Sequence, residues 1–297
     1  MSTPRLFLPD IAARSRLSRW SAVAVAGLVT GVALLTGGPA AAQAATGATA
    51  GPAGSSVFVE ELTSPELRDR IKSGNVTTVL IPIGGTEQNG PHMVLGKHNV
   101  RVRALAGQIA RKLGDAVVAP AMAYVAEGGI HPPQSHMRYS GTISLPDGVF
   151  ESVVEAAARS FRQHGIKTVV LLGDHGGYQK SLARVATRLN HEWAREPGSR
   201  VIALAEYYEA GQVTFVAELK RRGYSDAEIG QHAGLLDTSL ALAIDPALVR
   251  AERLPAAKPG EGVTGDARRA SAELGQVGVQ LIVDASVRAI RAAAAAH

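Results

Sequence analysis

The stretch "VTTVLIPIGGTEQNGPHMVLGKHN", residues 76–99, carries strong indications of both the fold and the site. Its first part, 76–83, is apolar or β-branched throughout, as expected of a parallel strand that is buried on both faces. The sixteen residues that follow hold one acid, two histidines, two asparagines and four glycines. A loop so rich in polar side chains, placed directly after a buried strand, indicates a functional site.

Strands and helices alternate through the rest of the chain. Apolar runs predict further strands at 116–120, 167–173 and 200–207, with 141–145 as a candidate edge strand. Periodicity and helix-ending glycines predict helices at 64–74, 99–113, 147–164, 179–193, 211–222 and 276–295. The first of these is expected to begin with Ser64 as the capping residue. This alternation indicates βαβ units, and hence an α/β fold with a mainly parallel central sheet.

The first 42 residues have the pattern of a cleavable export signal. A basic start precedes the apolar run 21–35, which is too short to span a bilayer comfortably, and small residues at 40–44 offer A-x-A cleavage sites. We therefore expect an exported protein, periplasmic or secreted, with a flexible lead-in at 43–56 and a single domain at 57–297. The alternative is an uncleaved segment, which would be the protein's one contact with a membrane.

The composition excludes several kinds of site. The chain has no cysteine, so any metal must be held by histidine, aspartate, glutamate or asparagine. The formal charge is +5, and four basic residues and one acidic residue lie in 1–42, which leaves about +2 for the mature chain. We see no basic patch with interleaved aromatic residues and expect no nucleic-acid partner.

Four polar clusters are candidates for chemistry, and two of them follow predicted strands, whose carboxyl ends meet at one edge of a parallel sheet. The clusters contain Glu87, Asn89, His92 and His98; Asp174 and His175 in "GDHGG"; His136 in "HMRYSGTISL"; and His232 and Asp237 in "QHAGLLDTSLAL". A single loop histidine is more often a surface or hydrogen-bonded residue than a ligand. Four clusters in one α/β domain together indicate a metal or hydrolytic site.

The same segments resemble motifs of the creatininase, or creatinine amidohydrolase, family. "PIGGTEQNGPHMVLGKH" is similar to P-x-G-S-x-E-Q-H-G-P-H-L-P-L-G-T-D, and "HMRYSGTISL" to H-x-x-F-P-G-T-I-S-L. "LLGDHGGYQ" is similar to a segment with N-G-H-G-G-N, and "HAGLLDTSLAL" to H-A-G-x-x-E-T-S, so the resemblance covers about 60–247. It implies a three-layer α/β/α domain, often hexameric, that binds zinc or manganese and hydrolyses C–N bonds of cyclic or linear amides.

Matching the motifs residue by residue changes the expected metal centre. Glu87 and His175 keep two of the family's ligands, but Asn89 replaces a histidine and His98 replaces the aspartate that bridges two metals. A neutral imidazole is poorly suited to bridging, and an amide oxygen is a weak zinc ligand. We therefore expect one divalent ion, zinc or else manganese, held by Glu87, His98 and His175.

The resemblance also suggests catalytic and substrate-binding residues. His232 matches the family's proton-transfer histidine and would protonate the leaving nitrogen, while Asp237 or Asp174 would take a proton from water. We expect the substrate, a small amide that the sequence does not identify, to meet three further side chains: Asn89, His92 and His136. The expected protein is an exported amidohydrolase and a homo-oligomer. The alternatives are a non-catalytic exported protein that binds a metal or small ligand, and a lactonase or isomerase on the same fold.

Overall fold

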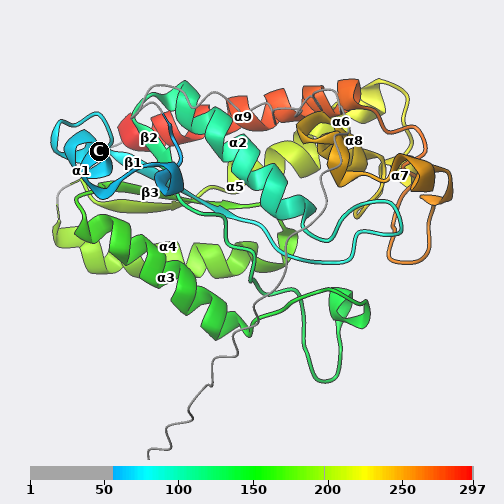
Figure 1. The fold of residues 1–297 in the computed structure, drawn as a ribbon, viewed down its shortest axis with the longest axis horizontal. Helices are drawn as coiled ribbons and strands as arrows, with labels where there is room; N and C mark the ends of the chain where they lie inside the picture. Colours follow the sequence, from blue (N-terminus) through cyan, green and yellow to red (C-terminus); the bar gives the residue numbers. More distant parts are fainter. Residues whose placement is uncertain (1–55, 197, 296–297) are drawn as a thin grey trace, which may run out of the picture. The chain divides into compact units, whose positions relative to one another are not determined.

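The structure is a computed structural model that describes residues 56–196 and 198–295, so the predicted export signal and almost all of the lead-in lie outside it. Its centre is a parallel sheet of four strands in the order β2-β1-β3-β4 (Figure 1). The strands are β1 (Thr78–Ile83), β2 (Ala116–Val118), β3 (Thr168–Gly173) and β4 (Arg200–Ala203). The predicted parallel α/β sheet is confirmed.

Helices cover both faces of this sheet, which gives the expected three layers (Figure 1). One face packs against α3 (Asp147–Gln163) and α4 (Gln179–Glu192), with α1 (Ser64–Lys72) beside them. The other face packs against α2 (Lys97–Leu113), α5 (Ala205–Glu209), α6 (Phe215–Arg221), α8 (Leu235–Ile244) and α9 (Ala272–Ala295). A single turn of helix, α7 (Asp226–Ile229), precedes α8.

The side chains of β1 alternate between the two cores. Val79, Ile81 and Ile83 pack in the core with α3 and α4, whereas Leu80 packs in the core with α2 and α9. All four side chains are fully buried. Because both faces of the strand are covered, the run is apolar at successive positions rather than at every second one.

Two predicted details are wrong. The capping residue of α1 is Thr63, whose hydroxyl accepts from Glu66 N while the Glu66 carboxylate accepts from Thr63 N, so this reciprocal capping box begins one residue earlier than expected. The segment 141–145 forms no strand. Its backbone bonds to two separate loops, from Ile143 N to Thr86 O and from Leu145 N to Val125 O, and so pairs with no single neighbour.

The chain turns into helix sooner after β4 than predicted. The strand ends at Ala203, α5 begins at Ala205, and a π-helical stretch at Ala210–Thr214 leads into α6. The start of α5 therefore stands at the carboxyl edge of the sheet. Among the helices of residues 56–295, none is both long and apolar enough to cross a membrane.

Candidate active site

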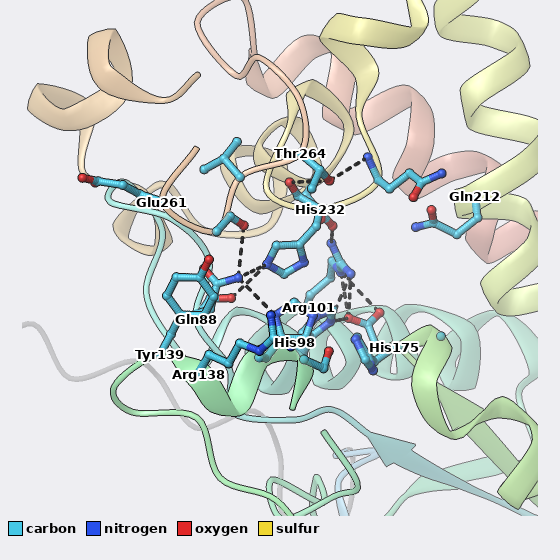
Figure 2. A pocket seen from close by; sticks show the side chains of 18 of the residues that line it. Gln88, His98, Arg101, Arg138, Tyr139, His175, Gln212, His232, Glu261 and Thr264 are labelled. Atoms are coloured by element: carbon cyan, nitrogen blue, oxygen red, sulfur yellow. Dashed lines mark hydrogen bonds and ion pairs between the residues drawn. The ribbon is translucent and has the colours of Figure 1, made fainter. Parts of the chain in front are cut away.

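The polar clusters meet at the carboxyl edge of the sheet, around a cavity of about 550 Å³ (Figure 2). β1 and β3 end side by side, with Ile83 opposite Gly173, so the loops that carry Glu87 and His175 leave the sheet together. The cavity is lined by residues of several segments, including His136, His175 and His232. These three histidines, which are 39 to 96 positions apart in the chain, are thus brought to one place.

Tyr178 holds the turn that carries His175. Its buried hydroxyl accepts hydrogen bonds from Asp174 N and His175 N, each at 3.1 Å, and lies 2.7 Å from Ile83 O, to which it can donate. One phenol therefore ties the glycine-rich turn after β3 to the end of β1. The position of the His175 ring follows from this anchor.

Every buried charged side chain in the described part of the chain belongs to this site. They are Glu87, Lys97, Arg101, Glu127, Asp174 and Asp237, and each is less than 9 % exposed. Burying charge is costly, and clusters of buried ionisable groups are concentrated at functional sites. With all four carboxyl groups ionised, these six side chains by themselves carry a net charge of −2.

Glu87 lies at the centre of a group of three metal-type donors. Its Oε2 is buried without a hydrogen-bond partner and lies 3.3 Å from His136 Nε2 and 3.5 Å from His175 Nε2. In a tetrahedral zinc site with bonds of about 2.0–2.1 Å, ligand atoms are about 3.3–3.4 Å apart. Glu87, His136 and His175 therefore have the donor types and the spacing that suit a zinc-sized ion.

His98, predicted to be a metal ligand, is not a member of this group. Its Nε2 lies 2.8 Å from Glu87 Oε1 and its Nδ1 lies 2.5 Å from Asp174 Oδ2, so both ring nitrogens face carboxylate oxygens. The third donor beside Glu87 and His175 is His136, for which we predicted a contact with substrate. The reason is spatial: His98 lies within the first turn of α2 and points between two acids, whereas His136 reaches in from a distant loop.

The two imidazoles of the donor group, those of His136 and His175, are neutral. Burial lowers the pKa of His175 to about 3, against the opposing attraction of Glu87, and burial also lowers the pKa of His136. Burial alone would raise the pKa of Glu87, but the hydrogen bond and charge of His98 and the charge of Lys97 hold it well below its usual value. The group thus presents one carboxylate and two neutral rings, the protonation states in which these side chains bind metal.

Asp174 and Asp237, predicted to be proton acceptors, are held in ion pairs. Arg101 contacts both acids, at 2.8 Å from Asp174 Oδ2 and 2.9 Å from Asp237 Oδ1. Lys97 lies 3.0 Å from Asp237 Oδ2, and the Tyr207 hydroxyl donates to Asp174 Oδ1 at 2.6 Å. Burial opposes ionisation, but these cations outweigh it and keep the pKa of each acid below its ordinary value. Neither carboxylate is suited to accept a proton.

Asn89 and His92, predicted to meet substrate, belong instead to the framework of their loop. The Asn89 side-chain amide donates to the backbone oxygens of Glu87 and Val94, at 2.9 and 3.0 Å. His92 Nε2 pairs with Thr238 Oγ1 at 2.9 Å, and its ring is fully buried. Neither side chain is among those that line the cavity.

His232 does line the cavity (Figure 2) and lies close to Glu87 and His136 of the donor group. Its Nε2 lies 2.9 Å from Gln88 O, an acceptor, and its Nδ1 lies 3.7 Å from Glu87 Oε1. Its ring centre is 4.4 Å from that of His136. Burial and the nearby charge of Lys97 lower its pKa to about 4, so the ring is neutral at pH 7. In the tautomer that donates Nε2–H to Gln88 O, its Nδ1 lone pair is available.

Three important side chains of the site, those of Lys97, Arg101 and Glu127, were not identified from the sequence. Lys97 and Arg101 occupy one side of α2, next to the buried apolar positions Val102 and Leu105, and a charge at such a position is a signal that sequence reasoning could have used. Glu127 lies in an irregular loop without periodicity, and no local pattern marks it as buried. Burial and the charge of Glu87 raise the pKa of Glu127 to about 9.

Comparison with known sequences places these residues in a family context. A family model described as "Creatininase: Creatinine amidohydrolase" matches residues 60–290. Over 264 residues the chain is 28 % identical to the creatinine amidohydrolase of Pseudomonas putida, covering 80 % of this chain and 96 % of that protein. Over 122 residues it is 34 % identical to a mycofactocin precursor peptide peptidase of Mycolicibacterium smegmatis, covering 39 % of this chain and 47 % of that protein.

Solved structures agree with this similarity. A structure titled "Creatininase Mn" superimposes with a TM-score of 0.66 at 27 % identity, covering 80 % of this chain and 98 % of that one. A creatininase described as of "Zn-Zn type" gives a TM-score of 0.65 at 27 % identity, with coverage of 80 % and 97 %. Manganese and zinc are therefore the metals named for these related folds.

Proposed function

Because the chain belongs to the creatininase family, we propose that it is a metal-dependent hydrolase that cleaves a C–N bond in a small cyclic or linear amide. The amidohydrolases among its relatives support the reaction class. The observation that carries the metal dependence is the cluster of buried charges, in which four carboxyl groups face two cations. A divalent ion beside Glu87 would balance this surplus of negative charge.

The same charge balance supports one ion rather than two. Without a cation, burial and the charge of Glu87 raise the pKa of Glu127 to about 9 and keep that acid protonated. With all four acids ionised, as a bound cation would favour, the net charge of −2 that they give with Lys97 and Arg101 equals the charge of a single divalent cation. A second ion would leave two uncompensated positive charges in a buried site, which is costly. Lys97 and Arg101 thus take over part of the neutralising role that a second metal would have. Zinc is the proposed ion and manganese the alternative, since both occur in the titles of related structures.

The proposed ligands are Glu87, His136 and His175, which revises the set predicted from the sequence in one member. For Nε2 of His136 to bind a cation, its Nδ1 must carry the proton. The Gln88 side-chain amide lies 3.0 Å from that Nδ1. Gln88 Nε2 also donates to Gly262 O at 3.1 Å, and Gln88 Oε1 accepts from Gly90 N at 3.0 Å, so the amide presents its nitrogen to His136. The hydrogen bond between Gln88 and His136 would therefore be lost when a cation binds His136 Nε2.

A divalent ion at this position supplies Lewis acidity to the scissile carbonyl and lowers the pKa of a neighbouring water. His232 then acts as the general base and the general acid of the reaction. Because its Nε2–H donates to Gln88 O, its Nδ1 accepts a proton from the attacking water and afterwards releases it to the leaving nitrogen. Asp237 and Asp174 do not transfer protons in this scheme: they fix Lys97, Arg101 and His98 around the carboxylate of Glu87.

Export and assembly are further parts of the proposal. The basic start, short apolar run and small residues of 1–42 support a cleavable signal, with cleavage near Gln43 or Ala45. N-terminal sequencing of the exported protein tests this, and a membrane-bound chain that keeps residues 1–42 would contradict it. A homo-oligomer, hexameric by family resemblance, is proposed on that resemblance alone, and light scattering of the purified protein tests it.

Hydrolysis of an amide panel by the purified protein, measured with and without zinc, tests the activity. The panel should contain cyclic amides, including creatinine, and linear amides, including short peptides, because relatives act on both kinds of C–N bond. We expect turnover of at least one class that is lost on chelation and restored by zinc. Tight binding of an amide without turnover would favour the non-catalytic binding protein. If a lactone tested beside the amides were the only substrate turned over, the lactonase alternative would be favoured.

A further inference from the structure

The loop between β2 and α3 carries Glu127, a glutamate whose side chain has no exposed surface. Neither Oε1 nor Oε2 has a hydrogen-bond partner among the described residues. A buried carboxyl group in such a state is costly to the fold, and side chains of this kind are retained mainly at functional sites. Glu127 therefore needs a role that neither the family motifs nor the proposed ligand set provides.

The backbone around Glu127 is built to accept an inward-pointing carboxyl group. Glu127 N donates to the Ser144 hydroxyl at 3.0 Å, which fixes the main chain. On the opposite side lies Gly85, whose φ is +140°. A Cβ at Gly85 would lie only 2.3 Å from Glu127 Oε1, so the space that this carboxyl group occupies depends on a glycine.

The carboxyl group reaches the ring of His175. Glu127 Oε2 lies 3.3 Å from His175 Nδ1, and Gly177 N lies 3.1 Å from the same nitrogen. The two neighbours favour opposite tautomers. A backbone N–H can only donate, and so stabilises the ring that carries its proton on Nε2, whereas a carboxylate accepts and stabilises a proton on Nδ1. Only the second tautomer leaves the Nε2 lone pair free towards Glu87.

We propose that Glu127 is a positioning residue of the metal centre, which accepts the Nδ1 proton of His175 and thereby presents Nε2 as a ligand. This inference rests on the proposed metal site at Glu87, His136 and His175. Without Glu127, Gly177 N–H would be the remaining neighbour of Nδ1 within the described residues, and it favours the tautomer that cannot bind a cation.

Zinc affinity of the full-length protein, measured by competition with a chromophoric chelator, tests the inference without any activity assay. The variants are Glu127→Gln and Glu127→Ala, with Glu252→Gln as the control because Glu252 is exposed and does not line the cavity. Partners that orient a ligating histidine typically change metal affinity about 10–100-fold. We expect a loss in that range for both Glu127 variants, a smaller loss for Glu127→Asp, and none for the control.

Two further measurements separate tautomer control from a general structural role. Ring ¹⁵N NMR of the metal-free proteins should show more of the Nδ1–H tautomer of His175 in the wild type than in Glu127→Ala, in which the proton should shift towards Nε2. Gly85→Ala should weaken zinc binding as well, because the added methyl group displaces the Glu127 carboxyl group while leaving its charge in place.

The outcomes distinguish this inference from the proposed function. If the wild type binds zinc and both Glu127→Gln and Glu127→Ala bind it within twofold of the wild type, the inference is wrong and the metal site stands. If the folded wild type binds no zinc, both are wrong. If Glu127→Ala does not fold, Glu127→Met, which is similar in length and has no oxygen to accept the Nδ1 proton, takes its place.

Discussion

Lys97 Nζ lies 3.0 Å from Asp237 Oδ2, and the Lys97 side chain is only 1 % exposed. A lysine buried to this degree is rare unless it is paired. Arg101 holds the other oxygen of the same carboxylate at 2.9 Å, so two cations from successive turns of α2 share one acid of α8. This arrangement joins two helices across the site and places fixed positive charge beside the donor group of Glu87.

The acid stability of the metal-free protein follows from these pairs. The pKa of Asp237 is well below 3.8 in the folded chain, so its contribution to the free energy of unfolding is present above about pH 4 and is lost as the pH falls below that value. Asp237→Asn should cost about 3–5 kcal/mol at pH 7, because it leaves buried cations without their partner. It should also make the free energy of unfolding depend less steeply on pH below about pH 4. Urea unfolding of chelator-treated protein from pH 3 to 7 measures both effects. The same dependence on pH below pH 4 in Asp237→Asn and the wild type would contradict the lowered pKa of Asp237.

The ligand set can be tested by comparing three histidines. His136→Ala and His175→Ala should each lose most of the bound metal, because each removes one of three donors around Glu87 Oε2. His98→Gln should keep more of it, since the ring of His98 is engaged by Glu87 and Asp174. Elemental analysis of the three variants, each shown by circular dichroism to be folded, gives the answer. Metal loss in His98→Gln with retention in His136→Ala would restore the set predicted from the sequence.

The proton-transfer role of His232 predicts a separation between rate and metal binding. His232→Gln should lower kcat on the order of 10²–10⁴-fold, the usual range for losing a general acid or base. Metal content should be unchanged, because His232 lies outside the group of three donors. The exposed His191 offers a matched control, and His191→Gln should retain full activity. A fully active His232→Gln would show that another group moves the proton.

The layers of the fold were predictable because the strands are buried on both faces. Runs such as 76–83 and 167–173 are continuously apolar, and their alternation with helical segments leaves few other arrangements. The error at 141–145 has a different origin. Two of its backbone N–H groups bond to Thr86 and Val125 in separate loops, and the local sequence pattern does not show whether such bonds go to a strand or to loops.

The site was predictable as a set of loops and not as a set of contacts. Family motifs and loop positions identified Glu87, His175 and His232, and both histidines do lie beside Glu87. Which of two histidines, His98 or His136, completes the donor group depends on side-chain directions from α2 and from a distant loop, and spacing along the chain does not contain that information. The burial of Glu127 depends in the same way on tertiary packing against Gly85.

The metal content of the wild-type chain tests the central claim most directly. Elemental analysis of folded protein purified without chelator should give close to one zinc, or one manganese, per chain, because one divalent charge balances the buried cluster of four acids, Lys97 and Arg101. The double variant Asn89→His with His98→Asp should raise the content above one by restoring strong donors for a second ion. Two ions per wild-type chain would contradict the charge balance, and a folded protein without any metal would contradict the proposed hydrolase.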